Sequence, residues 1–172
     1  ASLFEGERYD ATKEAEIEGF TKADYNPEAA GWRMAETVET RSPFADQDLV
    51  VRHDDEVHVI NTLSADLIGE NKSGSGSYIY DFGENVAAVP QITIPSEYAE
   101  EGETITIRVA EMLYPELEEY GDLAGNLLQE NYRAALTTDF YTMKDGEQTY
   151  VPDLTFHGYR YIEITGLREA LP

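Results

Sequence analysis

The chain contains no cysteine, and this absence removes several classes of protein. It excludes a disulfide-stapled scaffold, catalysis by a thiolate and a zinc site with cysteine ligands. No apolar run approaches the roughly 18 residues that a membrane helix needs, and no signal-peptide pattern opens the chain. We therefore expect a folded domain that depends on its hydrophobic core for stability.

Basic residues are scarce. Lysine and arginine total 12 against 35 aspartates and glutamates, which gives a net charge of −23. Nucleic-acid binding needs a basic surface, and an anionic membrane repels a surface this acidic. We therefore expect neither nucleic acid nor membrane among the partners. The composition favours hard cations, because carboxylate and amide oxygens suit calcium.

Motifs of the common enzyme classes are also missing. The three histidines, His53, His58 and His157, form no zinc-type arrangement. The chain has no nucleophile elbow, phosphate loop or dinucleotide fingerprint. With 35 carboxylates, some pair lies at glycosidase spacing by chance, so their abundance does not indicate hydrolysis. These absences favour a binding module over an enzyme.

A chain of 172 residues with 41% hydrophobic residues is long enough for one domain with a sizeable core. We predict a single domain over residues 1–172. In it, an irregular N-terminal segment, residues 1–45, packs on the rest and contains a short helix within residues 10–18. Asn26-Pro27 and Gly31-Trp32 break any longer helix.

From about residue 48 the pattern becomes that of short strands separated by turns, which indicates an all-β sandwich or barrel. The predicted strands are Leu49–Arg52, Glu56–Asn61, Tyr78–Phe82, Ala87–Ile94, Thr104–Met112, Phe140–Met143, Gln148–Val151 and Tyr159–Thr165. Lys144–Glu147, with Asp145-Gly146 at its centre, predicts a hairpin between two of them.

Strand alternation places two charged residues beside apolar ones. Glu111 falls on the face of Ile105, Ile107 and Val109, and Arg160 falls on the face of Ile162 and Ile164. An unpaired buried charge is costly, so Glu111 and Arg160 either pair with each other or take backbone partners near one end of the sandwich. The alternative is that one of them lines a ligand pocket there.

Residues 113–136 form a long connection with few strand signals, and long connections inside a compact domain are usually functional. It ends in Gln129-Glu130-Asn131-Tyr132-Arg133. This string offers carboxylate and amide oxygens for calcium, and a ring and a guanidinium for a sugar. Taken alone, such a string is also typical of a turn or a helix cap.

Several strings together resemble the N-terminal β-sandwich region of bacterial α-L-rhamnosidases of glycoside hydrolase family 78, which includes carbohydrate-binding module family 67. They are, in order, Gly6-Glu7-Arg8-Tyr9-Asp10-Ala11, Gly31-Trp32, Tyr80-Asp81-Phe82-Gly83-Glu84-Asn85, Arg108-Val109-Ala110-Glu111-Met112-Leu113, Gln129-Glu130-Asn131-Tyr132-Arg133, Thr138-Asp139-Phe140-Tyr141 and Phe156-His157-Gly158-Tyr159-Arg160-Tyr161-Ile162-Glu163. The resemblance spans nearly the whole chain. Glu84 and Tyr132 depart from it, because the family has Gln and Leu there.

The resemblance implies a jelly-roll sandwich that binds terminal L-rhamnose through a calcium ion held by Glu130 and Asn131. The residues that it brings forward as sugar contacts are Tyr132, Arg133, His157, Arg160, Asp81 and Asn85. It also implies a secreted, periplasmic or cell-surface protein that targets an attached polysaccharide-degrading enzyme to rhamnose-containing glycans. The start at Ala1-Ser2, without methionine, is expected of a processed or excised piece.

Three functions follow from these observations. The first is a calcium-dependent rhamnose-binding module without catalytic activity of its own. The second is an accessory sandwich of an α-L-rhamnosidase that binds no ligand, in which His157-Gly158 is only the entry to a strand. The third is an independent enzyme, which the lack of catalytic motifs and of the family's helical barrel disfavours.

Overall fold

The structure is a computed structural model, which describes residues 3–37, 48, 50–72, 74 and 76–172. Contacts divide the chain into two units, the first Ala1–Ala15 with Leu63–Pro172 and the second Glu16–Thr62. The prediction of one domain, with residues 1–45 packed on the rest, stays a prediction. No helix in the described part of the chain is long and apolar enough to cross a membrane.

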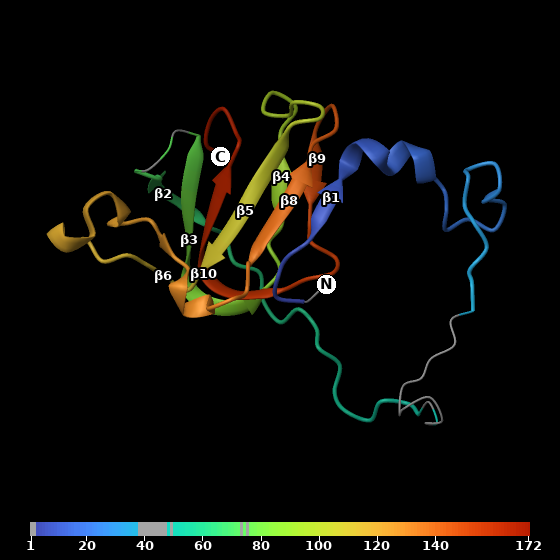
Figure 1. Cartoon of the computed structure of the whole chain (residues 1–172), viewed down its shortest axis with the longest axis horizontal. Helices are drawn as coiled ribbons and strands as arrows, with labels where there is room; N and C mark the ends of the chain where they lie inside the picture. Colours follow the sequence, from blue (N-terminus) through green and yellow to red (C-terminus); the bar gives the residue numbers. More distant parts are fainter. Residues whose placement is uncertain (1–2, 38–47, 49, 73, 75) are drawn as a thin grey trace. The chain divides into compact units, whose positions relative to one another are not determined.

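A six-stranded sheet forms one layer of the first unit (Figure 1). Its strands, in spatial order, are β1 (Arg8–Asp10), β8 (Thr138–Thr142), β5 (Thr104–Ala110), β10 (His157–Thr165), β3 (Ser77–Ala88) and β2 (Asp66–Glu70). Neighbouring strands are antiparallel except β1 and β8, which run parallel. This architecture confirms the predicted all-β sandwich.

The second layer is the pair β4 (Ile92–Ile94) and β9 (Gln148–Tyr150). The core lies between this pair and the large sheet, as the alternation along β5 predicts: Ile105, Ile107 and Val109 are fully buried. The rings of Tyr141 and Tyr150 stack across the layers with centroids 4.6 Å apart. Apolar packing on one face of each layer is therefore the main stabilising contribution.

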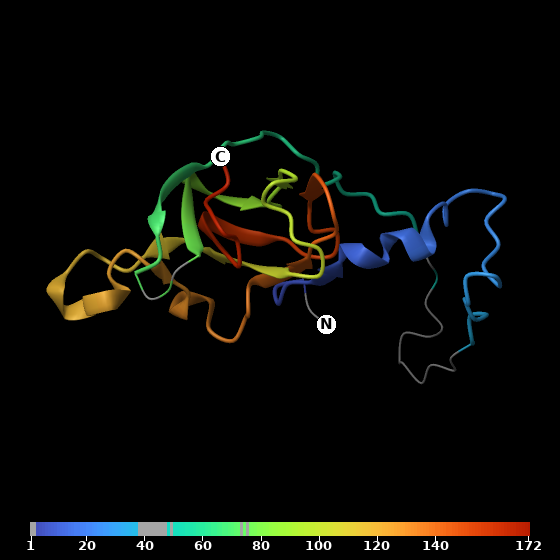
Figure 2. The ribbon, with the colours of Figure 1, turned by 90° about the horizontal axis from the view of Figure 1, so that it is seen from above.

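The long connection after β5 contains short elements of its own. These are β6 (Met112–Leu113), the 3-10 helix η2 (Glu118–Leu123), β7 (Leu127–Leu128) and the 3-10 helix η3 (Glu130–Tyr132). β6 and β7 pair with each other at its base. In both views the gold segment that joins β6 to β7 projects away from the sheets (Figures 1 and 2).

The N-terminal strand β1 is fixed to the rest of the first unit through Gly6 and Glu7. Gly6 has a φ of +105°, and a Cβ there would overlap the carbonyl oxygen of Thr138, so only glycine fits. The Glu7 carboxylate accepts the Tyr150 hydroxyl and the backbone N–H groups of Asp153 and Leu154. Gly6 and Glu7, the first two residues of the first sequence string, therefore hold the N-terminal segment against the sandwich.

The second unit begins within the 3-10 helix η1 (Ala11–Ile17), close to the predicted helix over residues 10–18. The ring of Trp32 packs on those of Phe20 and Tyr25, with centroids 6.3 and 6.1 Å away. The predicted strand Glu56–Asn61 is wrong, because none of its residues pairs with a described strand. The described residues of the predicted strand Leu49–Arg52 form no strand either, and Leu49 itself lies outside the described residues.

The predicted hairpin around Lys144–Glu147 is also wrong. β8 pairs with β5 and β1, whereas β9 pairs with β4, so the turn carries the chain from one layer to the other. The Gln148 side chain stabilises the turn between β8 and β9. Its side chain accepts the Lys144 N–H and donates to the carbonyl oxygens of Lys144 and Gly146, which closes the turn without a strand pair.

Candidate functional site

The pairing between β3 and β10 changes register at the Tyr80–Asn85 string. Val86 faces Tyr159 and Asp81 faces Tyr161, so the five steps on β3 from 81 to 86 match only two on β10 from 159 to 161. The residues between Asp81 and Val86 therefore form a bulge. Gly83 permits it, since its φ is +81° and its N–H donates to Asp81 Oδ1 at 2.7 Å.

Asp81 also binds Arg160. Arg160 Nε donates to Asp81 Oδ1 and Nη2 to Oδ2, both at 2.8 Å, which is the forked geometry of a strong ion pair. The hydrogen bond from Arg160 lowers the pKa of Asp81. The Arg160 guanidinium also lies 5.0 Å from the centroid of the Tyr161 ring.

The predicted partners of Arg160, Glu111 or backbone groups, are therefore wrong, because Arg160 pairs with the Asp81 carboxylate. Strict alternation put Arg160 on the face of Ile162, but the register shift at this point moves Arg160 and Tyr161 away from the core face. Glu111 lies between β5 and β6, half-buried, and has different partners.

Glu111 is the centre of a polar group at the surface. Its Oε2 accepts Asn131 Nδ2 at 2.6 Å, and its Oε1 accepts Asn85 Nδ2 at 3.4 Å. A Cβ built on Gly158 would lie 4.0 Å from Glu111 Oε1, so Gly158 borders the same place. We call Asn85, Glu111 and Asn131 the Glu111 cluster. It joins three strings that are far apart in sequence.

The Gln129–Arg133 string splits its side chains between the interior and the surface. Exposed Glu130 accepts the Tyr114 hydroxyl at 2.9 Å, and this hydrogen bond raises the pKa of Tyr114. The Tyr132 hydroxyl donates to the Gly158 carbonyl at 2.6 Å, and burial raises the pKa of Tyr132. Arg133 is exposed, with a φ of +60°.

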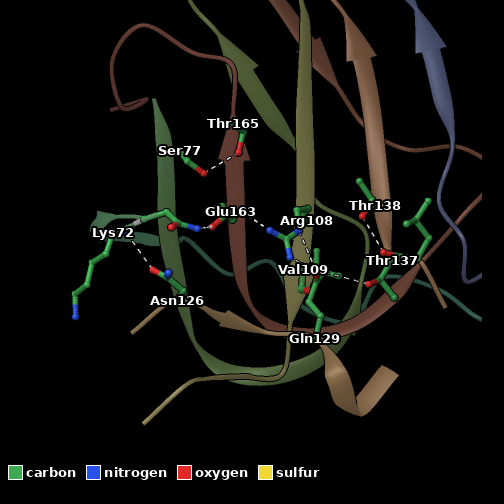
Figure 3. Close-up of polar contacts among 12 residues, drawn as sticks. Lys72, Ser77, Arg108, Val109, Asn126, Gln129, Thr137, Thr138, Glu163 and Thr165 are labelled. Carbon is green, nitrogen blue, oxygen red and sulfur yellow. Dashed lines mark hydrogen bonds and ion pairs between the residues drawn. The ribbon is translucent and has the colours of Figure 1, made fainter. Parts of the chain in front are cut away.

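Gln129 anchors this string to the sheet (Figure 3). Its Oε1 accepts hydrogen bonds from both Nε and Nη2 of Arg108, and its Nε2 donates to the Val109 carbonyl and to Thr137 Oγ1. Arg108 Nη1 donates a hydrogen bond to Glu163 Oε1 at 3.0 Å. We call Arg108, Gln129 and Glu163 the Arg108 network, and it positions the residues that follow Gln129.

His157 lies away from the surface. Its side chain is 1% exposed, and its Nε2 is 3.4 Å from Asp139 Oδ2. Asp139 Oδ1 in turn accepts the Glu7 N–H at 2.8 Å. The structure therefore brings Asn85 and Asn131 together through Glu111, and Asp81 together with Arg160, but leaves His157 in the interior.

A protein-family model described as the bacterial alpha-L-rhamnosidase concanavalin-like domain matches residues 71–172. This range is more than half of the chain and contains the Glu111 cluster, the Asp81–Arg160 pair and the Arg108 network. The chain belongs to this family.

Relatives of this rhamnosidase domain are much longer proteins. An alpha-L-rhamnosidase of Alteromonas sp. (strain LOR) is 32% identical over 171 residues, which cover 99% of this chain and 16% of the relative. One from Streptomyces avermitilis is 33% identical over 167 residues, which cover 96% of this chain and 14% of the relative. The chain therefore spans about a sixth of the length of these enzymes.

Solved structures of α-L-rhamnosidases also match this chain over a small part of their own length. The crystal structure of the Streptomyces avermitilis alpha-L-rhamnosidase complexed with L-rhamnose matches 99% of this chain and 15% of its own, with 32% identity and a TM-score of 0.81. The alpha-L-rhamnosidase from Dictyoglumus thermophilum matches 62% of this chain and 11% of its own, with 34% identity and a TM-score of 0.51. The rhamnosidase domain thus has the concanavalin-like sandwich fold.

Sequence reasoning missed the Arg108 network of this rhamnosidase domain. The signal was present, since Arg108 stands between two core residues of β5 and Glu163 between two of β10. Their pairing depends on strand register, which puts Glu163 opposite Arg108. Register between strands distant in sequence is not readable from either strand alone, so the ion pair was not predicted.

Proposed function

We propose that this chain is a non-catalytic rhamnose-binding module of an α-L-rhamnosidase, of the kind represented by carbohydrate-binding module family 67. In this proposal a calcium ion connects the protein to the sugar. The observation that carries it is the Glu111 cluster, in which a carboxylate and two amides from three strings meet at the surface. The matched Streptomyces avermitilis enzyme was crystallised with L-rhamnose, which supports the choice of sugar.

We propose that the calcium ion is weakly bound. In the described part of the chain, no group of three or more His, Asp or Glu side chains is placed to hold a metal. Calcium takes roughly six to eight oxygen ligands, and amides, carbonyls and water serve as well as carboxylates. We propose that Glu130 and Asn131 hold it together with Glu111. Bound calcium supplies coordination positions that sugar hydroxyls can occupy.

Asn131 carries the amide oxygen that this role requires. Its amide nitrogen now donates to Glu111, and a half-turn of the amide group brings its oxygen to the same side instead. The exposed carboxylate of Glu130 precedes it in the chain. The net charge of −23 favours the binding of a cation between these oxygens.

The remaining site residues have distinct roles in this proposal. Arg133 offers an exposed guanidinium, and Asn85 offers an amide at the edge of the bulge. The Tyr132 hydroxyl is fixed by the Gly158 carbonyl, and its ring is a proposed sugar contact. Asp81 and Arg160 keep each other oriented, and Asp81 holds the bulge through Gly83. His157 acts from the interior, through the position of Gly158, because its side chain has no surface for sugar.

The wider setting is also a proposal. Since relatives are full-length rhamnosidases of which this chain is about a sixth, we propose that it is covalently linked to a catalytic domain. Its target is a polysaccharide or oligosaccharide with rhamnose, which places the protein outside the cell or at its surface. Several linked copies would raise a weak single-site affinity through avidity.

A structural accessory sandwich without a ligand is the second candidate, and one observation favours it. Glu111 already satisfies the amide groups of Asn85 and Asn131, so the cluster is stable without a ligand. The two candidates differ in what removal of Asn131 does: the first predicts loss of rhamnose binding, and the second predicts no binding to lose.

Titration calorimetry with L-rhamnose in calcium buffer tests the choice. We expect Asn131→Ala and Glu111→Ala to abolish the heat of binding while the melting temperature changes little. Glu84→Gln, on the same bulge but exposed, is the matched control and should bind like the wild type. Normal rhamnose binding by both alanine variants would contradict the site, and no binding by the wild type would favour the structural candidate.

A further inference from the structure

An arm of the long connection after β5 borders the candidate site. We call residues 114–126, between β6 and β7, the arm; it lies in the gold segment that projects away from the sheets (Figures 1 and 2). The arm has two tyrosines, Tyr114 and Tyr120, and both are half-buried. Among the described residues, neither ring belongs to a hydrophobic cluster, so core packing does not account for their position.

The base of the arm is fixed to the first unit. Tyr114 N–H donates to the Asn126 carbonyl and Gly125 N–H donates to the Tyr114 carbonyl, each at 2.9 Å, which extends the pairing of β6 with β7. Lys72 binds the arm twice (Figure 3): its N–H donates to the Asn126 side chain, and its ammonium group pairs with Glu116 at 3.1 Å. Tyr114 is therefore held at a defined position.

Tyr114 connects the arm to the site residue Glu130. Its hydroxyl donates to Glu130 Oε1 at 2.9 Å. Glu130 precedes Asn131, whose amide donates to Glu111. The arm and the Glu111 cluster are thus joined through two consecutive residues, and the Tyr114 ring begins one hydrogen bond away from a carboxylate of the candidate site.

The ring of Tyr120 extends the surface that Tyr114 begins. The two ring centroids are 5.5 Å apart, and the ring planes are inclined by 49°, so each ring covers the other only in part. A tyrosine offers a flat apolar face and a hydroxyl that forms hydrogen bonds. A sugar ring has the matching features, an apolar face of C–H groups and a rim of hydroxyls. Two adjacent tyrosines beside a polar cluster therefore suit a sugar.

We propose that Tyr114 and Tyr120 form a second subsite, which binds the sugar residue linked to the anomeric carbon of a rhamnose held at the Glu111 cluster. The inference rests on the proposed function, since it takes that rhamnose site as its starting point. It makes the module selective for oligosaccharides that end in rhamnose over the free monosaccharide.

The charge of the arm restricts the class of the second sugar. Residues 114–126 contain four acidic residues and no lysine or arginine. Two of the acidic residues, Glu118 and Glu119, directly precede Tyr120 and are exposed. Like charges repel, so a uronic acid beside Tyr120 is a poorer ligand than an uncharged hexose. The second subsite therefore suits a neutral sugar.

Calorimetric titration in calcium buffer with free L-rhamnose and with an α-L-rhamnosyl-glucose disaccharide tests the subsite. The readout is the ratio of the two Kd values. For the wild-type chain we expect the disaccharide to bind about three- to tenfold more tightly, which is the gain expected from one aromatic contact. Equal affinities, or weaker binding of the disaccharide, would overturn the subsite and leave the rhamnose site in place. No binding of either ligand would overturn both proposals.

Variants of Tyr120 show whether its ring is responsible. Tyr120→Ala removes the ring and should bring the ratio to about one, whereas Tyr120→Phe keeps the ring and should preserve most of it. Leu154→Ala, exposed on the connection between β9 and β10, is the control and should keep the wild-type ratio. Because both ligands are measured on the same variant, partial unfolding lowers both affinities and leaves the ratio unchanged. An unaltered ratio in Tyr120→Ala would overturn the assignment of this ring to the sugar.

A rhamnosyl-glucuronic acid disaccharide tests the charge of the subsite. It should bind more weakly than the rhamnosyl-glucose disaccharide, and the difference should shrink as sodium chloride screens the carboxylates. Equal or tighter binding of the uronic acid, or a difference that salt does not change, would overturn the assignment to a neutral sugar.

Discussion

Asp81 holds Arg160 by two hydrogen bonds of 2.8 Å, and the same carboxylate accepts the backbone N–H of Gly83. One side chain therefore fixes both the bulge of β3 and the guanidinium of β10. The pair joins strings 79 residues apart, and it places Asn85, four residues after Asp81, within reach of Glu111. The contribution of the Asp81–Arg160 pair to folding stability should depend on pH.

The pKa of Asp81 is lowered from its ordinary value of 3.8 by the Arg160 hydrogen bond. A lowered carboxyl pKa contributes stability that is fully present above the unfolded-state value and is lost as the pH falls through the folded-state value. We expect wild type to melt higher than Asp81→Asn by a constant margin above about pH 5, and by a shrinking margin below about pH 4. Circular dichroism melts from pH 3 to 7 measure this, and a margin that grows at low pH would contradict it.

The Arg108 network should contribute to stability through its buried member. Glu163 is 1% exposed and accepts hydrogen bonds from Arg108 and Asn71. Glu163→Ala leaves both donors without this acceptor, so we expect unfolding to require roughly 1–3 kcal/mol less free energy. Urea denaturation measures it, with Glu84→Ala as an exposed control. A loss no larger than the control's would mean that the network is dispensable.

Gln129 should order the loop that follows it. Gln129→Leu keeps the size of the side chain and removes its bonds to Arg108, Val109 and Thr137. We expect faster hydrogen exchange at residues 130–133 and weaker rhamnose binding, while the sheet stays protected. Glu119→Gln, exposed on η2 of the same connection, is the control and should leave exchange unchanged. Unaltered exchange in Gln129→Leu would show that other contacts hold the loop.

A substitution in the hydrophobic core should lower the free energy of unfolding more than a substitution in the Arg108 network. Ile107 is fully buried between the two layers. Ile107→Ala should lower the free energy of unfolding by about 2–5 kcal/mol through the cavity that it leaves, without changing rhamnose affinity in the folded fraction. Thr93→Ala, exposed on β4, is the control. An Ile107→Ala variant as stable as this control would contradict the core assignment.

Much of the sandwich could be predicted from the sequence, because local alternation decides it. β5 follows its apolar pattern residue by residue, and Ile107 and Ile164 are buried as expected. Pairing could not be predicted to the same extent. The hairpin at Asp145-Gly146 has the right turn residues, but Gln148 closes the turn within itself, so β8 and β9 separate into different sheets.

The contacts of the candidate site could be predicted only in part, for the same reason. The resemblance picked out Asn85, Asn131 and Arg160, and the structure puts each in a polar contact. It did not reveal that Glu111 joins the two asparagines, because one register shift between β3 and β10 decides which residues face one another. A bulge of this kind leaves only Gly83 as a sequence signal.

The most direct measurement of the central claim is a calorimetric titration of the wild-type chain with L-rhamnose, first in calcium and then in excess chelator. A single monosaccharide held by one calcium ion and a few polar groups should bind with a Kd of about 0.01–1 mM. We expect this binding in calcium, its loss in chelator and its return when calcium is restored, whereas magnesium should substitute poorly. Binding of equal strength in chelator, or none in calcium, would contradict the account.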